Sequence, residues 1–154
     1  MARARLKNIV EGMEFQSDEM TAYFHRPTGR VLPISDEAFA AAEEGDEEWV
    51  EPEELAEARS ILAHEDEYVA LPDRVEIDEY RMMERFAVGS QDTEQREELL
   101  RALHGAGAFR RFKDAVHRQG VADEWYSFRD HGYEKVAREW CEANNIEIDR
   151  HVDA

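Results

Sequence analysis

The chain has 154 residues, enough for one hydrophobic core and too few to make two domains the default, so we predict a single domain over residues 1–154. Its formal net charge of -18 disfavours nucleic-acid binding as the main function, because proteins that bind phosphate backbones usually do so through a basic domain. Cys141 is the only cysteine and no apolar run approaches the ~18 residues of a membrane span, so the sequence excludes an intrachain disulfide and offers no spanning helix.

The N-terminal part is predicted to form a helix followed by a β-hairpin. Apolar residues at helical spacing predict the helix over residues 4–15, and they are Leu6, Ile9, Val10 and Met13. Pro27 and Gly29 lie in a turn between two apolar segments, which predicts a hairpin within residues 20–35. Because a two-stranded hairpin is marginal in water, we expect residues 68–72 to add a third strand.

The middle of the chain is predicted to contain three helices. Ser35 caps a short helix that Gly45 ends, and Asp46-Glu47-Glu48 follows as a solvated acidic loop. A second helix begins near Pro52 and ends near His64, and a third covers residues 77–88.

This middle segment also holds the whole excess of negative charge. Residues 35–98 carry 23 acidic and 5 basic residues, while 16 of the 19 basic residues in the chain are arginine. Such a composition is typical of proteins adapted to high intracellular salt, where screening shortens charge repulsion. Mimicry of nucleic acid is the alternative; we prefer salt adaptation because a mimic needs carboxylates over its whole surface.

Two helices joined by glycine form the segment around which we expect the rest to pack. Leu99, Leu100 and Leu103 lie on the first helix, Gly105 is predicted to be a left-handed cap, and the second helix covers residues 108–118. We expect Phe109, Phe112 and Val116 to form one buried face. The remaining positions give the only basic cluster of the chain, and we take as candidate binding residues Arg110, Arg111, Lys113, His117 and Arg118.

After Gly120, a last long helical segment is predicted to be buried at Trp125, Phe128, Val136 and Trp140. Tyr126 either packs in the core, which we prefer, or exposes its ring to a partner. Residues 146–148 alternate in polarity and either join the hairpin sheet or form a frayed tail. The fold class is therefore predicted to be α+β, predominantly helical, with a small two- or three-stranded antiparallel sheet.

Several short runs resemble a known family. The run GAGAFRRFKD at residues 105–114 is followed by EWYSF and AREW, and preceded by YFH, TG, LP and YRMMERF. In this order they resemble a bacterial uncharacterised protein family, number 0158 in its series, from about residue 6 to residue 148. The resemblance implies a domain without an established activity, catalytic residue or cofactor. The acidic segment at residues 45–57 is heavier than the family pattern.

The residues favour a non-catalytic interaction module that binds an acidic partner or an anionic ligand through the basic helix face. The alternative is a helix-turn-helix-like nucleic-acid-binding protein that uses the same helix. Asp114 lies four residues from Arg110 and from Arg118, so an ordinary ion-pair ladder is the structural alternative to both. The glycines at 105 and 107 also offer backbone N–H groups to a phosphate, although loop geometry alone accounts for them.

No motif for catalysis or metal binding is present. The six histidines lack ligand spacing, and no serine or threonine lies in a nucleophile elbow, so we expect no metal, no cofactor and no dedicated catalytic residue. An enzyme with a dispersed site stays open, and a deep pocket with converging polar groups would favour it. The N-terminal residues lack the apolar core of a signal peptide, and with one cysteine this leads us to expect a cytoplasmic protein.

Overall fold

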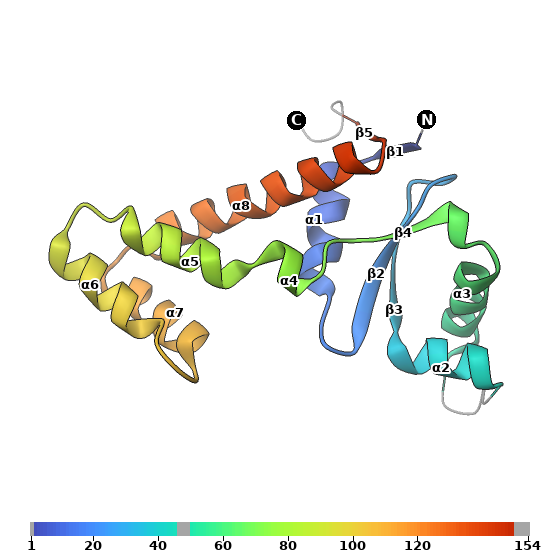
Figure 1. The fold of residues 1–154 in the computed structure, drawn as a ribbon, viewed down its shortest axis with the longest axis horizontal. Coiled ribbons are helices and arrows are strands. Elements are labelled where there is room, and N and C mark those ends of the chain that lie inside the picture. The colour runs from blue at the N-terminus through green and yellow to red at the C-terminus, as the bar shows by residue number, and fades with distance from the viewer. Residues whose placement is uncertain (1, 46–49, 150–154) are drawn as a thin grey trace. The chain divides into compact units, whose positions relative to one another are not determined.

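The structure, a computed structural model, describes residues 2–45 and 50–149 (Figure 1). Within it the chain forms two compact units: unit 1 takes residues up to 76 and from 136 onwards, and unit 2 takes residues 77–135. The predicted fold class is confirmed: the protein is α+β and mainly helical, with a small antiparallel sheet. The predicted loop Asp46-Glu47-Glu48 lies outside the described residues.

The elements follow the chain in this order. Unit 1 contains β1 (Ala2–Ala4), α1 (Leu6–Phe15), β2 (Met20–His25), β3 (Val31–Ser35), α2 (Asp36–Glu44), α3 (Pro52–Ala63), a 3-10 turn η1 (Glu65–Glu67), β4 (Tyr68–Ala70) and β5 (Ile146–Ile148). Unit 2 contains α5 (Glu79–Val88), α6 (Thr93–Ala102) and α7 (Ala108–Arg118). The short α4 (Arg74–Ile77) and the long α8 (Ala122–Ala143) each contribute residues to both units.

The predicted hairpin and its third strand are confirmed. The strands lie in the order β3-β2-β4, all antiparallel, with Tyr23 opposite Leu32 and opposite Ala70. Side chains alternate along a strand, so they point to both faces of the sheet. Helices cover both of these faces. On one face, Leu32 and Ile34 pack with residues of α2 and α3. On the other face α1 lies so close that a Cβ added to Gly12 would be 2.7 Å from the Val31 side chain (Figure 1).

Strand β3 is an edge strand with few free donors along its outer side. His25 N–H donates to Arg30 C=O at the turn, and antiparallel pairs alternate, so the backbone of Val31, Pro33 and Ser35 faces away from β2. Proline has no N–H, and the Ser35 N–H donates to Glu54 Oε1 at 2.8 Å. Of the three residues of β3 that face outward, only Val31 therefore has an N–H that is neither missing, as in Pro33, nor bonded to Glu54, as in Ser35.

The two chain ends form a second small sheet that the sequence did not predict. Residues 2–4 form β1, so the first helix begins at Leu6 and not at residue 4 as predicted, and β5 pairs with β1 in parallel, Ala2 opposite Ile146. The hypothesis that residues 146–148 join the hairpin sheet or fray is therefore wrong. Their strand partner is more than 140 positions away in the sequence, and no local pattern points to it.

Unit 2 is built around a cluster of aromatic rings. Phe112 and Trp125 are fully buried, with ring centroids 5.0 Å apart, and the Phe86 ring packs edge-on against both. The predictions for Phe109 and Phe128 are wrong, because these side chains are 44% and 38% exposed.

The buried face of α7 explains the exposure of Phe109. Its buried residues are Ala108, Phe112, Ala115 and Val116. At 100° per residue their centre lies close to Phe112, which leaves Phe109 at the edge of the face. The two alanines therefore fix the orientation of the helix more than the second aromatic ring does.

Candidate functional site

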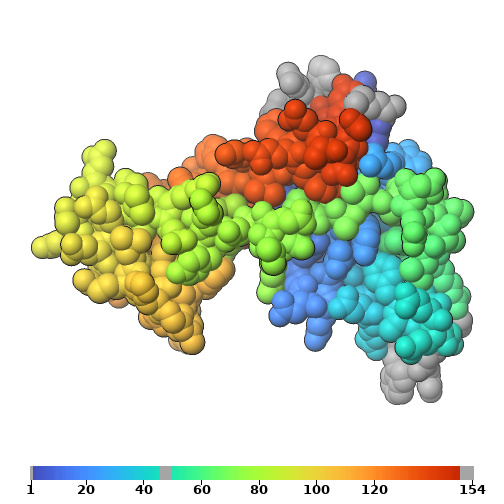
Figure 2. All heavy atoms as spheres, viewed as in Figure 1, coloured from blue at the N-terminus to red at the C-terminus, as the bar shows by residue number. Residues whose placement is uncertain are grey.

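The basic helix α7 is held by glycine at its start. Gly105 and Gly107 both have φ of 78°, in the left-handed region that favours glycine, and Gly107 is the N-cap of α7. The helix covers Ala108–Arg118, as the sequence predicts. All five candidate binding residues are exposed on it, and Figure 2 shows α6 and α7, in yellow and orange, as one continuous surface.

Arg111 faces the turn between α6 and α7. Its guanidinium Nε donates to the C=O of Ala102 at 3.1 Å, and its terminal nitrogens donate to the C=O groups of His104 and Ala106. These carbonyls lie at and just beyond the C-terminal end of α6, where no intrahelical donor is left for them. The structure thus places Arg111 as a clasp for the turn, and its donors are engaged within the protein.

Arg118 is also engaged, on the side of α6. Its guanidinium pairs with Glu98, whose other oxygen accepts from Gln119 Nε2 at 2.9 Å. The expectation of an ion-pair ladder through Asp114 is wrong for Arg118, whose partner is Glu98. Within residues 2–45 and 50–149, Asp114 forms no ion pair with Arg110 or with Arg118.

The remaining three residues form what we call the basic stripe: Arg110, Lys113 and His117. At 100° per residue their side chains fall within about 60° of one another, opposite the buried face of α7. In the described part of the chain, none of these three side chains makes a hydrogen bond or an ion pair. The stripe therefore presents two permanent cations and one imidazole to solvent.

Two half-exposed aromatic rings flank the basic stripe. Phe109 lies four residues before Lys113, and Tyr126, at the start of α8, places its ring centroid 6.2 Å from that of His117. The preferred core position for Tyr126 is wrong, because its side chain is 40% exposed. The sequence signal for this flank was the pair Trp125-Tyr126, of which only the first residue is buried.

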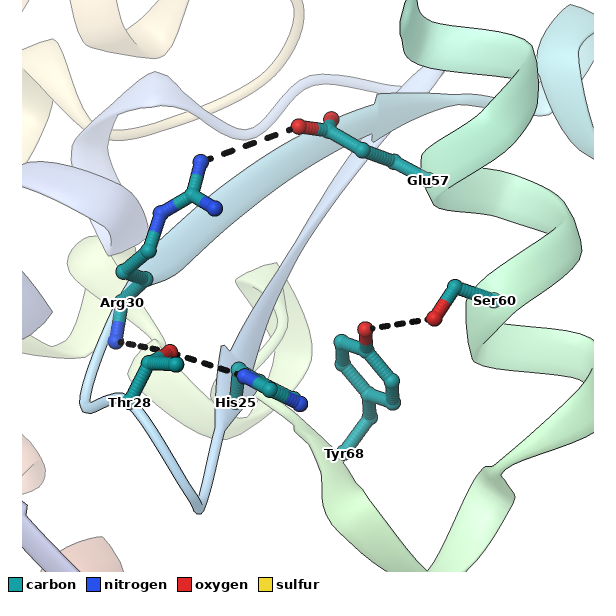
Figure 3. Close-up of polar contacts among 6 residues, drawn as sticks. All are labelled: His25, Thr28, Arg30, Glu57, Ser60 and Tyr68. Carbon is teal, nitrogen blue, oxygen red and sulfur yellow. Dashed lines mark hydrogen bonds and ion pairs between the residues drawn. The ribbon is translucent and has the colours of Figure 1, made fainter.

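Unit 1 contains a polar cluster that the sequence reasoning missed (Figure 3). The His25 ring lies 4.5 Å from the Tyr68 ring between centroids, and its Nδ1 is 2.8 Å from Thr28 Oγ1. The Tyr68 hydroxyl is 2.9 Å from Ser60 Oγ, and Arg30 is 3.8 Å from Glu57. These contacts join the hairpin turn and β4 to α3. The register of β2 with β4, which sets His25 opposite Tyr68, was the missing information.

A hollow of about 350 Å³ lies between α1 and the hairpin in unit 1. Its lining residues are Asn8, Glu11, Gly12, Phe15, Ala22, Arg30, Val31 and Pro33. Both charged residues already have partners, since Glu11 is 3.9 Å from Lys7 and Arg30 is 3.8 Å from Glu57.

Two further properties concern metals and membranes. Among the residues that the structure describes, no group of three or more His, Cys, Asp or Glu is arranged to hold a metal ion. No described helix has the length and apolar character needed to cross a membrane.

Comparison with known proteins gives one match. The model of a family described as "Uncharacterised protein family (UPF0158)" matches residues 3–153, nearly the whole chain. No curated protein and no solved structure matches it.

Proposed function

The chain belongs to the Uncharacterised protein family (UPF0158), and on that premise we propose that it is a non-catalytic module that binds an acidic partner or an anionic ligand on the basic stripe. The family description assigns no activity, so the proposal rests on the residues themselves. It names Arg110 and Lys113 as the charged contacts and His117 as a hydrogen-bonding contact between them and Tyr126.

One observation carries the proposal: cations stay unneutralised on a chain with an excess of carboxylates. The protein has 37 acidic and 19 basic residues, yet Arg110 and Lys113 make no ion pair within the described residues. Arg111 and Arg118, although engaged, add positive charge beside them. An anionic group on this face gains attraction from these four cations, against which stand two neighbouring carboxylates, that of Asp114 and that of Glu98, which is paired with Arg118.

A charge-reversal experiment tests this function. The ligand is a synthetic polyglutamate peptide at low salt, and the variant is Arg110→Glu/Lys113→Glu, which we expect to weaken binding by about tenfold or more. The matched control is Arg81→Glu/Arg85→Glu, which reverses two exposed arginines on α5 of the same unit. Equal affinity for wild type and for the α7 variant overturns the proposal.

The alternative is nucleic-acid binding by a helix-turn-helix-like pair. The observation in its favour is the arrangement of α6 and α7, joined through a turn of residues 103–107 that contains two glycines. It predicts binding of a DNA duplex whose affinity falls steeply with salt, as counterion release requires. A mobility-shift titration that shows no complex at low salt removes this alternative.

We attribute the acidic excess to adaptation to high salt, propose the cytoplasm as the location and treat residues 1–154 as one domain. Unfolding at high salt tests the salt adaptation, and unfolding of single-tryptophan variants tests the single domain. Imaging of the tagged protein in cells tests the cytoplasmic location, and an extracellular signal would contradict it.

A further inference from the structure

We propose that the occupant of the basic stripe is an acidic protein segment that also carries apolar side chains, and that Phe109 and Tyr126 bind those side chains. This inference rests on the proposed function and deepens it, because it names the kind of partner. Free carboxylates alone would satisfy the stripe, but they would leave both aromatic rings in water.

The two rings lie in one row with Lys113 and His117 of the stripe. Phe109, Lys113 and His117 follow one another at intervals of four residues, which places neighbouring side chains on one side of α7. The row continues from His117 to the Tyr126 ring, 6.2 Å away between centroids. From Phe109 to His117 the helix rises by about 12 Å, the length of two turns and a part of a third. An extended or helical peptide of a few residues spans this distance.

Because both rings are exposed, we expect the partner to carry apolar side chains that bury them. Phe109 is 44% exposed and Tyr126 is 40% exposed, while the neighbouring Phe112 and Trp125 are fully buried. Removing apolar surface from water is the main favourable contribution in most protein association. Tyrosine, phenylalanine and arginine are also enriched in protein interfaces, and lysine is depleted there, so the aromatic ends and Arg110 fit an interface best.

Charge favours a protein segment over a nucleic acid. The stripe itself has only two permanent cations, and the guanidinium groups of Arg111 and Arg118, although exposed, already bond to groups of the protein. Affinity for a phosphate backbone rises with the number of phosphates neutralised, so two contacts give little. Residues 77–135 carry 10 basic and 12 acidic residues, so unit 2 lacks the overall basic excess that nucleic-acid-binding domains usually have.

The test compares two peptides of equal length and equal negative charge. One contains glutamate and serine, and the other contains glutamate with leucine in place of serine. A short oligothymidylate is the third ligand, and fluorescence anisotropy at low salt gives the dissociation constants. We expect the glutamate–leucine peptide to bind wild type about fivefold to tenfold more tightly than the glutamate–serine peptide.

Variants at the rings separate this inference from the proposed function. We expect Phe109→Ser and Tyr126→Ser to remove the preference for leucine while both variants keep the affinity for the glutamate–serine peptide. Phe109→Gln serves as a second variant if Phe109→Ser unfolds, as judged by circular dichroism. The matched controls are Phe15→Ser and Val88→Ser, which change side chains that are each 62% exposed on α1 and α5; both should keep the preference.

The outcomes are distinct. Equal binding of both peptides, lost in Arg110→Glu/Lys113→Glu, overturns this inference and leaves the proposed function intact. A preference for leucine that survives Phe109→Ser and Tyr126→Ser also overturns it. Tighter binding of oligothymidylate than of either peptide overturns it in favour of a nucleic acid. Absence of binding by all three ligands contradicts both the inference and the proposed function.

Discussion

The two units of this chain differ in both core and charge. Unit 1 places a three-stranded sheet between α1 and the pair α2 and α3, and its residues carry 25 acidic against 9 basic side chains. Unit 2 is entirely helical in its described elements, is centred on aromatic rings and is close to neutral. The acidic excess is thus a property of unit 1. Unit 2, which carries the proposed binding face, has nearly equal numbers of acidic and basic residues.

The largest expected effect comes from matched phenylalanines in the two cores. Phe24 in unit 1 and Phe112 in unit 2 are both fully buried. Phe24→Ala and Phe112→Ala should each lower the free energy of unfolding by about 3–5 kcal/mol, because each leaves a cavity. Phe109→Ala should cost less than about 1 kcal/mol, since the ring is half exposed. Urea titrations followed by circular dichroism give these values.

The same experiment tests the single-domain proposal. Two single-tryptophan variants keep Trp140, which belongs to unit 1, or Trp125, which belongs to unit 2. In one cooperative domain, Phe112→Ala shifts the fluorescence transition of both tryptophans by the same amount. A shift confined to Trp125 would show that the units unfold separately.

A second prediction concerns Cys141, on the part of α8 that belongs to unit 1. Burial raises the pKa of this thiol to about 11, and the positive charge of Arg138 opposes the shift in part. The folded protein therefore holds the thiol proton more tightly than the unfolded chain does. Its contribution is fully present below the unfolded pKa and is lost as the pH rises through the folded pKa.

The measurement for Cys141 compares wild type with Cys141→Ala. Between about pH 9 and about pH 11, wild type should lose about 2–3 kcal/mol of unfolding free energy more than the variant does. The difference between the two proteins is used because tyrosines and lysines titrate in the same range; Tyr23, whose pKa burial also raises, is one of them. Parallel pH curves for both proteins would contradict the prediction.

The third prediction compares one helical glycine from each unit. A Cβ at Gly12 in α1 would lie 2.7 Å from the Leu71 and Val31 side chains, which belong to the packed sheet of unit 1. A Cβ at Gly132 in α8 would lie 2.8 Å from the Met82 sulfur, at the far part of a flexible side chain. Gly12→Ala should therefore destabilise by about 1–3 kcal/mol.

Gly132→Ala should be close to neutral, because alanine stabilises a helix by up to about 1 kcal/mol relative to glycine and offsets the movement of methionine. Thermal unfolding of both variants supplies the comparison. A larger loss for Gly132→Ala than for Gly12→Ala would mean that the core of unit 2 is the more tightly packed of the two.

The smallest expected effect is that of salt. Raising potassium chloride to about 1 M shortens the Debye length to about 3 Å and screens repulsion among the carboxylates of unit 1. The transition reported by Trp140 should gain about 1 kcal/mol or less, and that reported by Trp125 should gain less if the units respond separately. No gain at either tryptophan would contradict salt adaptation as the reason for the acidic composition.

Local signals in the sequence predicted several helix ends. Ser35 accepts from the Ala38 N–H, Gly45 and Gly105 adopt positive φ, and α7 begins and ends where expected. Each of these features depends on a few consecutive residues, so no tertiary information is needed. One local feature was missed: Asp78 has φ of 52° and its side chain accepts from Arg81 N–H, which separates α4 from α5.

Features that depend on distant contacts were not predictable in this way. The pairing of β1 with β5 joins the two ends of the described chain, and the cluster of His25, Tyr68 and Ser60 needs the sheet register. At the candidate site, the sequence identified the basic helix, but it did not distinguish Arg111 from Arg110. The two arginines differ because Arg111 donates to the carbonyl groups of the turn between α6 and α7, and Arg110 does not.

The outer side of β3 has a consequence for association of the protein with itself. An exposed strand edge templates the addition of further strands, which is how many folded proteins begin to form fibrils. Here Pro33 offers no donor, and Glu54 occupies the N–H of Ser35. An incoming strand finds a single outward N–H on β3, that of Val31, so it cannot form a complete hydrogen-bond ladder along this edge.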